Sequence, residues 1–306
     1  MRPLDARDFD PPDEDALLFI NFVQIVRIIA DLTQASLRGN LNFGRRLEIE
    51  VSLRSWLMDL PDVFHLHDRK TRTLRPYTFR SRQLHVPYFV ALIILFRQDA
   101  PDKCPSGASV LAASYISGIF EEYLDWGDIS FVSPASIFYL LVASLLQISA
   151  QRFAILATCS EHEVRITNQA IEELKKRFPT AFGAERVINA IRTASTTSSH
   201  PARIGLDPHQ QDLFNPLGPG LCRQWRVVLG SAEPQQLVDT IAGTFSGEQV
   251  TPHEVRQSNH SMRPWQDEND GQDVSELNAY PFVTESDEAV FDAMGQWWWS
   301  DLLPDS

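Results

Sequence analysis

The feature that most constrains the fold of this chain is a series of apolar segments with helical spacing, bounded by prolines, glycines or capping residues. Within them, apolar side chains recur three and four residues apart, as on one face of an α-helix. The predicted helices cover residues 14–38, 45–59, 81–98, 107–124, 134–148, 160–178 and 184–195. No alternation of apolar and polar residues is long enough to indicate a strand, and there is no internal repeat. We therefore predict an all-α protein, an irregular multi-helix domain.

Local signals refine three of these helices. Ser133 before Pro134 is a capping residue followed by a proline at the first helical position, which marks the start of the fifth helix. That helix is apolar nearly all round, so we expect it to be central. Ser160 with Glu163 three residues later matches a capping box and predicts the start of the sixth helix. Pro87 removes a backbone donor inside the third helix and should kink it.

The periodicity divides the chain into four regions. An acidic leader, residues 1–13, is predicted to be disordered, and a helical domain follows over residues 14–195. Residues 196–263 are rich in Ser, Thr, Pro, Gln and His with short apolar islands, which indicates loops with two short helices. Residues 264–306 form an acidic tail with aromatic residues, too poor in periodic apolar positions to fold alone. We expect this tail to be disordered.

Charge is distributed unevenly along the chain. The formal net charge is -13, from 27 basic and 40 acidic residues, and the eleven acids of the tail are accompanied by no Lys or Arg. The rest of the chain is thus close to neutral. A protein that holds duplex DNA by itself needs a basic surface to neutralise phosphates. We therefore expect no direct DNA binding by this chain.

The cysteines and the apolar segments indicate the cellular compartment of such a chain. Cys104, Cys159 and Cys222 are far apart and form no C-x-x-C pair, so neither a structural zinc site nor a disulfide framework is expected. The acidic, proline-bearing start differs from the basic and then apolar opening of a signal peptide. The longest apolar stretch, residues 16–32, is interrupted by polar side chains and falls short of the ~20 apolar residues of a membrane span. We expect an intracellular protein without a membrane segment.

Catalytic signatures are absent from the sequence. It contains no G-x-S-x-G, H-E-x-x-H, G-x-G-x-x-G or G-x-x-x-x-G-K motif. His65 and His67, followed by Asp68, come nearest to a metal-ligand cluster, and we interpret them as solvated loop histidines. We therefore assign no catalytic residue, metal or cofactor and do not expect an enzyme.

Six basic residues without an intervening acid lie before and at the start of the third helix. They are Arg69, Lys70, Arg72, Arg75, Arg80 and Arg82. Such a run can be a solvated loop, a nuclear-import signal or a phosphate-contacting patch. The solvated loop is the plainest interpretation and import is the main functional alternative. Contact with nucleic acid would also need a positioned reading helix.

The tail sets six large apolar side chains among its carboxylates. They are Phe291, Trp297, Trp298, Trp299, Leu302 and Leu303. Acidic and aromatic composition of this kind is typical of transcriptional activation segments, whose aromatics bind grooves on coactivators as short helices. The alternative is a structural latch, in which the three tryptophans pack on the helical domain. The sequence leaves both open.

The order and spacing of several motifs resemble the middle homology region, the regulatory domain of fungal transcription factors with an N-terminal binuclear zinc cluster. That family has a W-L-x-x-L-P helix end, then an L-H-x-x-Y helix that ends in Arg, then a helix with paired alanines. The matching positions are Trp56, Leu57, Leu60 and Pro61; Leu84, His85, Tyr88, Leu92 and Arg97; and Ala112 and Ala113. The match covers residues 14–160, and its positions have the character of core and helix-packing residues.

The resemblance implies a transcriptional regulator in the nucleus. Its partners would be coactivators or the transcription machinery, together with a DNA-binding partner protein or an N-terminal DNA-binding domain. No six-cysteine cluster precedes the matched region, so zinc would enter only through such a missing domain. Family members often control pathway-specific gene clusters, including clusters for secondary metabolism.

Three positions depart from the family pattern. Gln98 follows Arg97 where the family often has proline, Pro87 interrupts the third helix, and Cys104 lies farther from Ala112 than the family's cysteine does. The rival hypothesis is a helical small-molecule-binding protein, or an enzyme whose site is built from scattered core residues without a recognisable motif.

Overall fold

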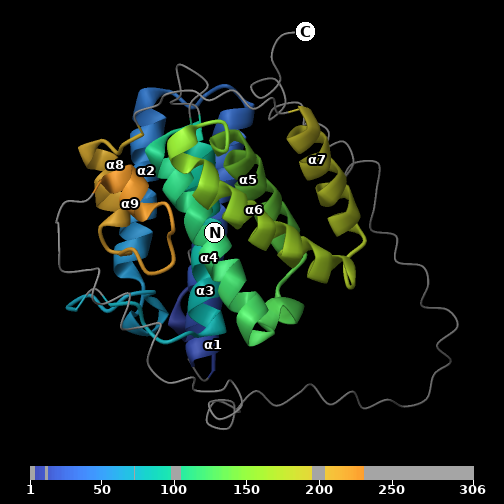
Figure 1. The fold of residues 1–306 in the computed structure, drawn as a ribbon. Helices are drawn as coiled ribbons and strands as arrows, with labels where there is room; N and C mark the ends of the chain where they lie inside the picture. The colour runs from blue at the N-terminus through green and yellow to red at the C-terminus, as the bar shows by residue number, and fades with distance from the viewer. Residues whose placement is uncertain (1–3, 11–12, 72, 98–104, 195–203, 231–306) are drawn as a thin grey trace, which may run out of the picture. The chain divides into compact units, whose positions relative to one another are not determined.

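The computed structural model describes residues 4–10, 13–71, 73–97, 105–194 and 204–230 (Figure 1). Its long helices are α1 (Glu14–Leu37), α2 (Phe43–Asp59), α3 (Phe79–Phe96), α4 (Gly107–Trp126), α5 (Ala135–Ala150), α6 (Ala154–Lys175) and α7 (Thr180–Ala194). Shorter elements are α8 (Pro208–Phe214), α9 (Trp225–Leu229) and the 3-10 turns η1 (Ala6–Asp8), η2 (Asp62–Phe64) and η4 (Asp128–Phe131). In these ranges the only bridge between extended residues joins His67 to Leu74. The predicted all-α class is confirmed.

Several long helices begin at side-chain caps that the sequence supplies. Asp13, Asn42, Thr78 and Ser106 each accept a hydrogen bond from the backbone N–H three residues later. α4 ends at Gly127, whose φ of 73° lies in the left-handed region that glycine tolerates. These local signals explain why the predicted limits of the first four helices agree closely with the observed ones.

The predicted start of the sixth helix is wrong. α6 begins at Ala154, so Ser160 and Glu163 lie inside the helix, where both are buried. The hydroxyl of Ser160 accepts a hydrogen bond from Nε2 of Gln224 at 3.0 Å. Ser160 and Glu163, which match the capping-box pattern, therefore do not cap a helix, and Ser160 contacts a distant part of the chain.

α3 and α4 form the centre of the helical unit. α4 packs against α3, α5 and α6, while α3 also packs against α1 (Figure 1). Every residue from Leu84 to Phe96 of α3 is buried. α5, which was expected to be central, packs against α3, α4, α6 and α7. It therefore shares the interior with α3 and α4, and its apolar surface all round correctly identified it as one of the central helices.

Residues 204–230, the described part of the segment predicted to be loop-rich, contain two short helices, as expected, and belong to the same helical unit as α1 to α7. α9 packs against α4, and α8 packs against α2. Gly118 of α4 lies so close to the carbonyl group of Leu221 that a Cβ atom would clash with it. Gly107 brings α4 equally close to the carbonyl group of Gly205. Two glycines on α4 thus let residues 204–230 lie directly against the helix backbone.

Disorder was predicted for both ends of the chain, and the structure bears on this prediction only at the N-terminal end. The leader, predicted to be disordered, contains η1, and the Phe9 ring meets the Phe19 ring of α1 edge to face at 6.0 Å. The tail, residues 264–306, lies outside the described residues, so the prediction that it is disordered stays a prediction.

Candidate functional site

Three of the residues that carry the family resemblance, Trp56, His85 and Tyr88, meet between α2 and α3. The Trp56 indole stacks on the Tyr88 ring, with centroids 5.6 Å apart, and meets the His85 ring edge to face at 6.1 Å. Nε1 of Trp56 donates to the carbonyl oxygen of Asn21 at 3.0 Å, which ties α1 to the cluster. The Tyr88 hydroxyl donates to the carbonyl oxygen of Leu213 at 3.1 Å, which adds α8. One aromatic cluster thus joins four helices.

Most of the other motif residues are packing residues as well. Buried to at least 97% are Leu57, Leu60, Leu84, Leu92, Ala112 and Ala113. Pro61 is half-buried directly after α2, and Arg97 caps the C-terminus of α3 with its backbone N–H. The motifs therefore specify how helices pack and place no reactive group at a surface.

The six basic residues do not form one solvated loop. Arg82 lies on α3, is fully buried, and pairs with both carboxylate oxygens of Glu122 on α4, at 2.6 and 3.0 Å. Arg80 lies on the same helix and pairs with Asp15 of α1 at 2.7 Å. The prediction of a solvated loop is wrong for Arg82, because α3 begins early enough to turn this side chain toward α4. Arg72 lies outside the described residues.

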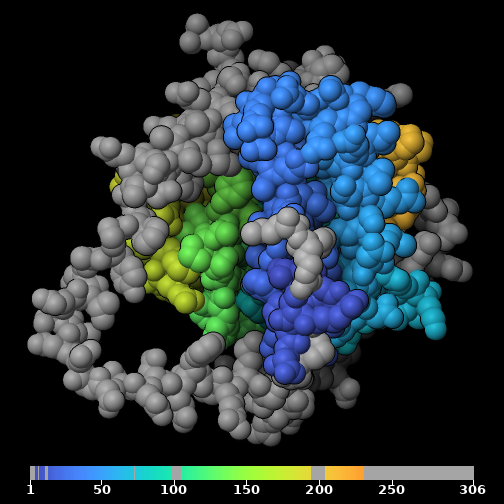
Figure 2. All heavy atoms as spheres, turned by 180° about the vertical axis from the view of Figure 1, so that it is seen from behind, coloured from blue at the N-terminus to red at the C-terminus, as the bar shows by residue number. Residues whose placement is uncertain are grey.

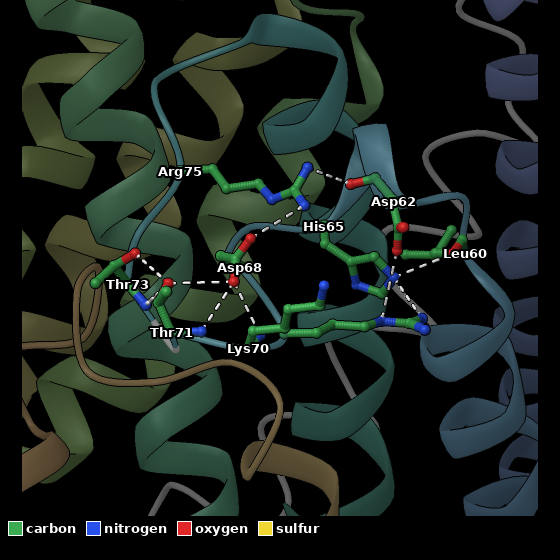
Figure 3. A network of polar contacts seen from close by, with 9 residues as sticks. Leu60, Asp62, His65, Asp68, Lys70, Thr71, Thr73 and Arg75 are labelled. Carbon is green, nitrogen blue, oxygen red and sulfur yellow. Dashed lines mark hydrogen bonds and ion pairs between the residues drawn. The ribbon is translucent and has the colours of Figure 1, made fainter.

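Arg69 and Arg75 brace the loop between α2 and α3 (Figure 3). The Arg69 guanidinium donates to the carbonyl oxygen of Met58 at 2.5 Å. The Arg75 guanidinium donates to the carbonyl oxygen of Asp62 at 2.7 Å. Both side chains are partly exposed, so their charges remain available at the surface while their donors hold the loop.

Asp68 organises the tip of this loop (Figure 3). Its carboxylate accepts hydrogen bonds from the backbone N–H groups of Thr71 and Lys70, at 2.8 and 2.9 Å. These bonds, that from Thr71 foremost, lower the pKa of the Asp68 carboxyl. An Asx-type turn therefore presents Lys70 on an ordered loop.

His65 and His67 are buried, which corrects their interpretation as solvated loop histidines. Their exposed fractions are 6% and 3%, because Leu66 between them is buried in the core and draws the loop inward. Burial lowers the pKa of His67 to about 4 and that of His85 to about 3, so both rings are neutral at pH 7. In the described part of the chain, no three His, Cys, Asp or Glu side chains are grouped to hold a metal ion.

A polar cluster that the sequence did not reveal lies between α4, α6 and the segment after α8. The Glu163 carboxyl accepts a hydrogen bond from the Ser114 hydroxyl, which itself accepts the backbone N–H of Gln224 at 3.2 Å. The Gln224 amide donates to Ser160 at 3.0 Å. Burial raises the pKa of Glu163 to about 7. The sequence did contain one signal for this cluster, the Glu163 carboxyl on an otherwise apolar helix face. The capping-box interpretation assigned that carboxyl to a helix end instead.

Cys222 lies beside this cluster without a reactive environment. Its Sγ donates weakly to the carbonyl oxygen of Leu111 at 3.8 Å, and burial raises the pKa of the thiol. A reactive cysteine is instead partly exposed and has a lowered pKa. Cys222 is therefore a packing residue of the interior.

Two of the hollows on the described surface bear on ligand binding. One, between α3 and α5, has a volume of about 10 Å³, room for about one water molecule. The other is an open polar depression at the turn between α1 and α2, lined by Asp31, Arg38, Asn42, Arg45 and Glu48 among others. Small-molecule sites are usually enclosed, mostly apolar and roughly 300–1,000 Å³ in volume. Neither hollow has that character.

The remaining predicted site residues belong to the tail and lie outside the described residues. They are Phe291, Trp297, Trp298, Trp299, Leu302 and Leu303. Comparison with known proteins adds no assignment: no family model, no curated protein and no solved structure matches the chain.

Proposed function

We propose that this chain is a nuclear transcriptional regulator of the kind whose regulatory domain its motifs resemble. The observation that supports this most is the aromatic cluster of Trp56, His85 and Tyr88. These residues come from two separate motifs and pack on each other across two helices. Motif residues that pack on each other agree with the core and helix-packing character that the resemblance implies for them.

In this function the helical unit acts through contacts with other proteins. The buried rings of His67 and His85 are neutral, the buried thiol of Cys222 is held protonated, and neither of the two hollows described above suits a small substrate. These features favour a regulator over the rival small-molecule-binding protein or enzyme. A DNA-binding partner protein or an N-terminal DNA-binding domain would provide DNA contacts, and the tail would contact coactivators. Control of a pathway-specific gene cluster is the finer role that the resemblance suggests.

Fusion to an unrelated DNA-binding domain tests the proposal. We expect the fused full chain to drive a reporter with the matching site, whereas the DNA-binding domain alone does not. The unfused chain should show no sequence-selective binding to duplex DNA in a gel shift at about 0.15 M salt, since it lacks a basic surface for phosphates. A silent fusion, or selective binding by the unfused chain, would contradict the proposal.

Nuclear entry is expected to depend on the basic run. Alanine at Arg80 or Arg82 would disturb ion pairs between helices, and alanine at Arg69 or Arg75 would release the loop backbone. The variant that combines Lys70→Ala, at an exposed position, with Arg72→Ala, outside the described residues, leaves these four side chains in place and should move a fluorescent fusion to the cytoplasm.

The matched control for this import test combines Lys70→Arg with Arg72→Lys, which keeps both charges and should stay nuclear. If the alanine variant stays nuclear while its circular dichroism is unchanged, the basic run has no import role.

A further inference from the structure

α1 presents an apolar stripe to solvent, opposite the side that it packs on the core. Phe19, Val26 and Leu37 are between 37% and 54% exposed. Val23 and Ala30 occupy the intervening positions, so these five residues repeat four, three, four and seven residues apart. Alternating steps of three and four give the spacing of a seam that receives another helix.

α2 extends this apolar surface. Phe43, Leu47, Val51 and Met58 lie on one face of the helix and are 45–83% exposed. Figure 2 shows α1 and α2 together at the surface of this side of the molecule. We name the set the α1–α2 apolar face: Phe19, Val26, Leu37, Phe43, Leu47, Val51 and Met58.

The concentration of these side chains indicates an interaction surface. In the part of the chain that the structure describes, thirteen large apolar side chains are exposed, and seven of them belong to the α1–α2 apolar face. Single exposed apolar residues are ordinary on a protein surface, but a contiguous group of them marks a contact site.

A membrane is the first occupant to consider, because α1 is long and apolar enough to cross one, with a mean hydropathy of 1.7. The helix is longer than the apolar stretch from which the sequence excluded a span. Its charges argue against a lipid surface: Glu14, Asp15 and Asp31 outnumber Arg27, whereas helices that lie on anionic membranes carry basic polar faces. α1 also packs against α2 and α3 of the same unit. The face therefore suits a protein partner better than a bilayer.

We propose that the α1–α2 apolar face is a homodimer interface, in which it meets the same face of a second copy of this chain. An aromatic side chain such as Phe19 or Phe43 offers roughly 150–250 Å² and the five Val, Leu and Met side chains offer less, so seven side chains that are about half exposed present on the order of 600 Å² per copy. This approaches the ~800 Å² per partner of a standard stable interface. Arg54, which lies between Val51 and Met58 on α2, already pairs with Asp212 of its own chain at 3.0 Å. Across a two-fold axis each apolar patch meets its own copy, so apolar side chains face apolar side chains.

Sedimentation equilibrium of the full chain at micromolar concentration tests the proposal. The expected mass is twice the 34.7 kDa of one chain. Val26→Glu on α1 and, separately, Val51→Glu on α2 should each weaken the dimer at least tenfold, because each places a carboxylate in the apolar contact. Both positions are exposed in the single chain, so circular dichroism should show an unchanged helical fold. If one of the two variants unfolds, the other still tests the proposal.

The matched control is Ile155→Glu on α6, which changes a side chain that is 55% exposed and lies off the α1–α2 apolar face. This variant should sediment as a dimer. A wild-type chain that stays monomeric, or a Val26→Glu chain as dimeric as the control, would overturn the proposal. So would a monomeric chain that floats with anionic lipid vesicles, since the face would then belong to a membrane surface.

Discussion

Arg82 shows how the position of one residue on a helix changes its role. In the sequence it is the last of six basic residues, yet on α3 it is buried and forms a two-bond ion pair with Glu122 of α4. Its guanidinium also donates to the carbonyl oxygen of Arg75 at 3.3 Å and lies 5.6 Å from the ring centroid of Tyr77. The side chain therefore ties the loop before α3 to the two central helices.

Removal of this side chain should be costly. Arg82→Ala leaves Glu122 without its partner, and breaking a buried pair typically lowers the free energy of unfolding by about 3–5 kcal/mol. Urea denaturation measures the change. The control is Arg54→Ala, whose pair with Asp212 is exposed on both sides and should contribute at most about 1 kcal/mol. Equal losses in the two variants would show that the buried pair does not hold α3 to α4.

Glu163 should make stability fall as pH rises. Its folded pKa is about 7, against an ordinary value of 4.5, so the folded protein holds a proton that the unfolded chain releases above pH 4.5. This contribution is complete below pH 4.5 and is lost as pH rises through 7, at about 1.4 kcal/mol per pH unit. Glu163→Gln removes the dependence, so its stability relative to wild type should increase by roughly 3 kcal/mol between pH 4.5 and 8.

The Glu163 test must be a difference between variant and wild type, because buried histidines act in the opposite direction. The folded pKa values of His67 and His85, about 4 and 3, lie below the ordinary 6.5, so their contribution is present above pH 6.5 and lost as pH falls. Urea denaturation at several pH values separates the two effects. Glu161→Gln, at an exposed position on the same helix, is the control and should leave the pH dependence unchanged.

At the scale of elements, α4 depends on a glycine for its contact with the segment after α8. Gly118→Ala would place a Cβ atom against the carbonyl group of Leu221, so the helix and the segment must separate. We expect a loss of roughly 1–3 kcal/mol, as for overpacked cores, with faster amide hydrogen exchange in residues 204–230.

The chain offers a matched control for the Gly118 test. Gly183 lies on α7 with no atom within 4 Å of an added Cβ atom, so Gly183→Ala should stabilise the protein by about 0.5–1 kcal/mol. Urea denaturation should therefore give opposite signs for the same substitution on two helices. A Gly118→Ala variant as stable as wild type would mean that residues 204–230 do not need this close approach.

The elements also show what could and could not be predicted from the sequence. The first four helices were predictable because caps such as Asn42 and Ser106 act within one turn of the chain. The start of α6 was missed because Ser160 bonds to Gln224, sixty-four residues away, and a local motif cannot reveal a distant partner. The polar cluster around Glu163 was missed for the same reason. The packing roles of Trp56 and Tyr88 followed from their motifs, while the burial of His67 depended on the fold of its loop.

At the scale of the whole molecule, charge and aromatic side chains separate the tail from the rest of the chain. The tail carries eleven acids and no base, whereas the preceding residues are nearly neutral. The described helical unit has a buried apolar core of its own. This division favours a separate task for the tail and allows that task to be tested by transfer to another protein.

If residues 264–306 activate transcription, they should drive a reporter when fused to an unrelated DNA-binding domain. Trp297, Trp298 and Trp299 replaced together by Ala should abolish this activity while all eleven acids remain. Each aromatic side chain buries roughly 150–250 Å² on binding, at about 25 cal/mol per Å² before ordering costs. Loss of three such anchors should remove most of a weak interaction with a coactivator.

Replacement of Glu285, Asp287 and Glu288 by their amides is the control and should only reduce the signal. A silent fusion, together with a lower melting temperature of the full chain carrying the three alanines, would instead make the tryptophans a structural latch.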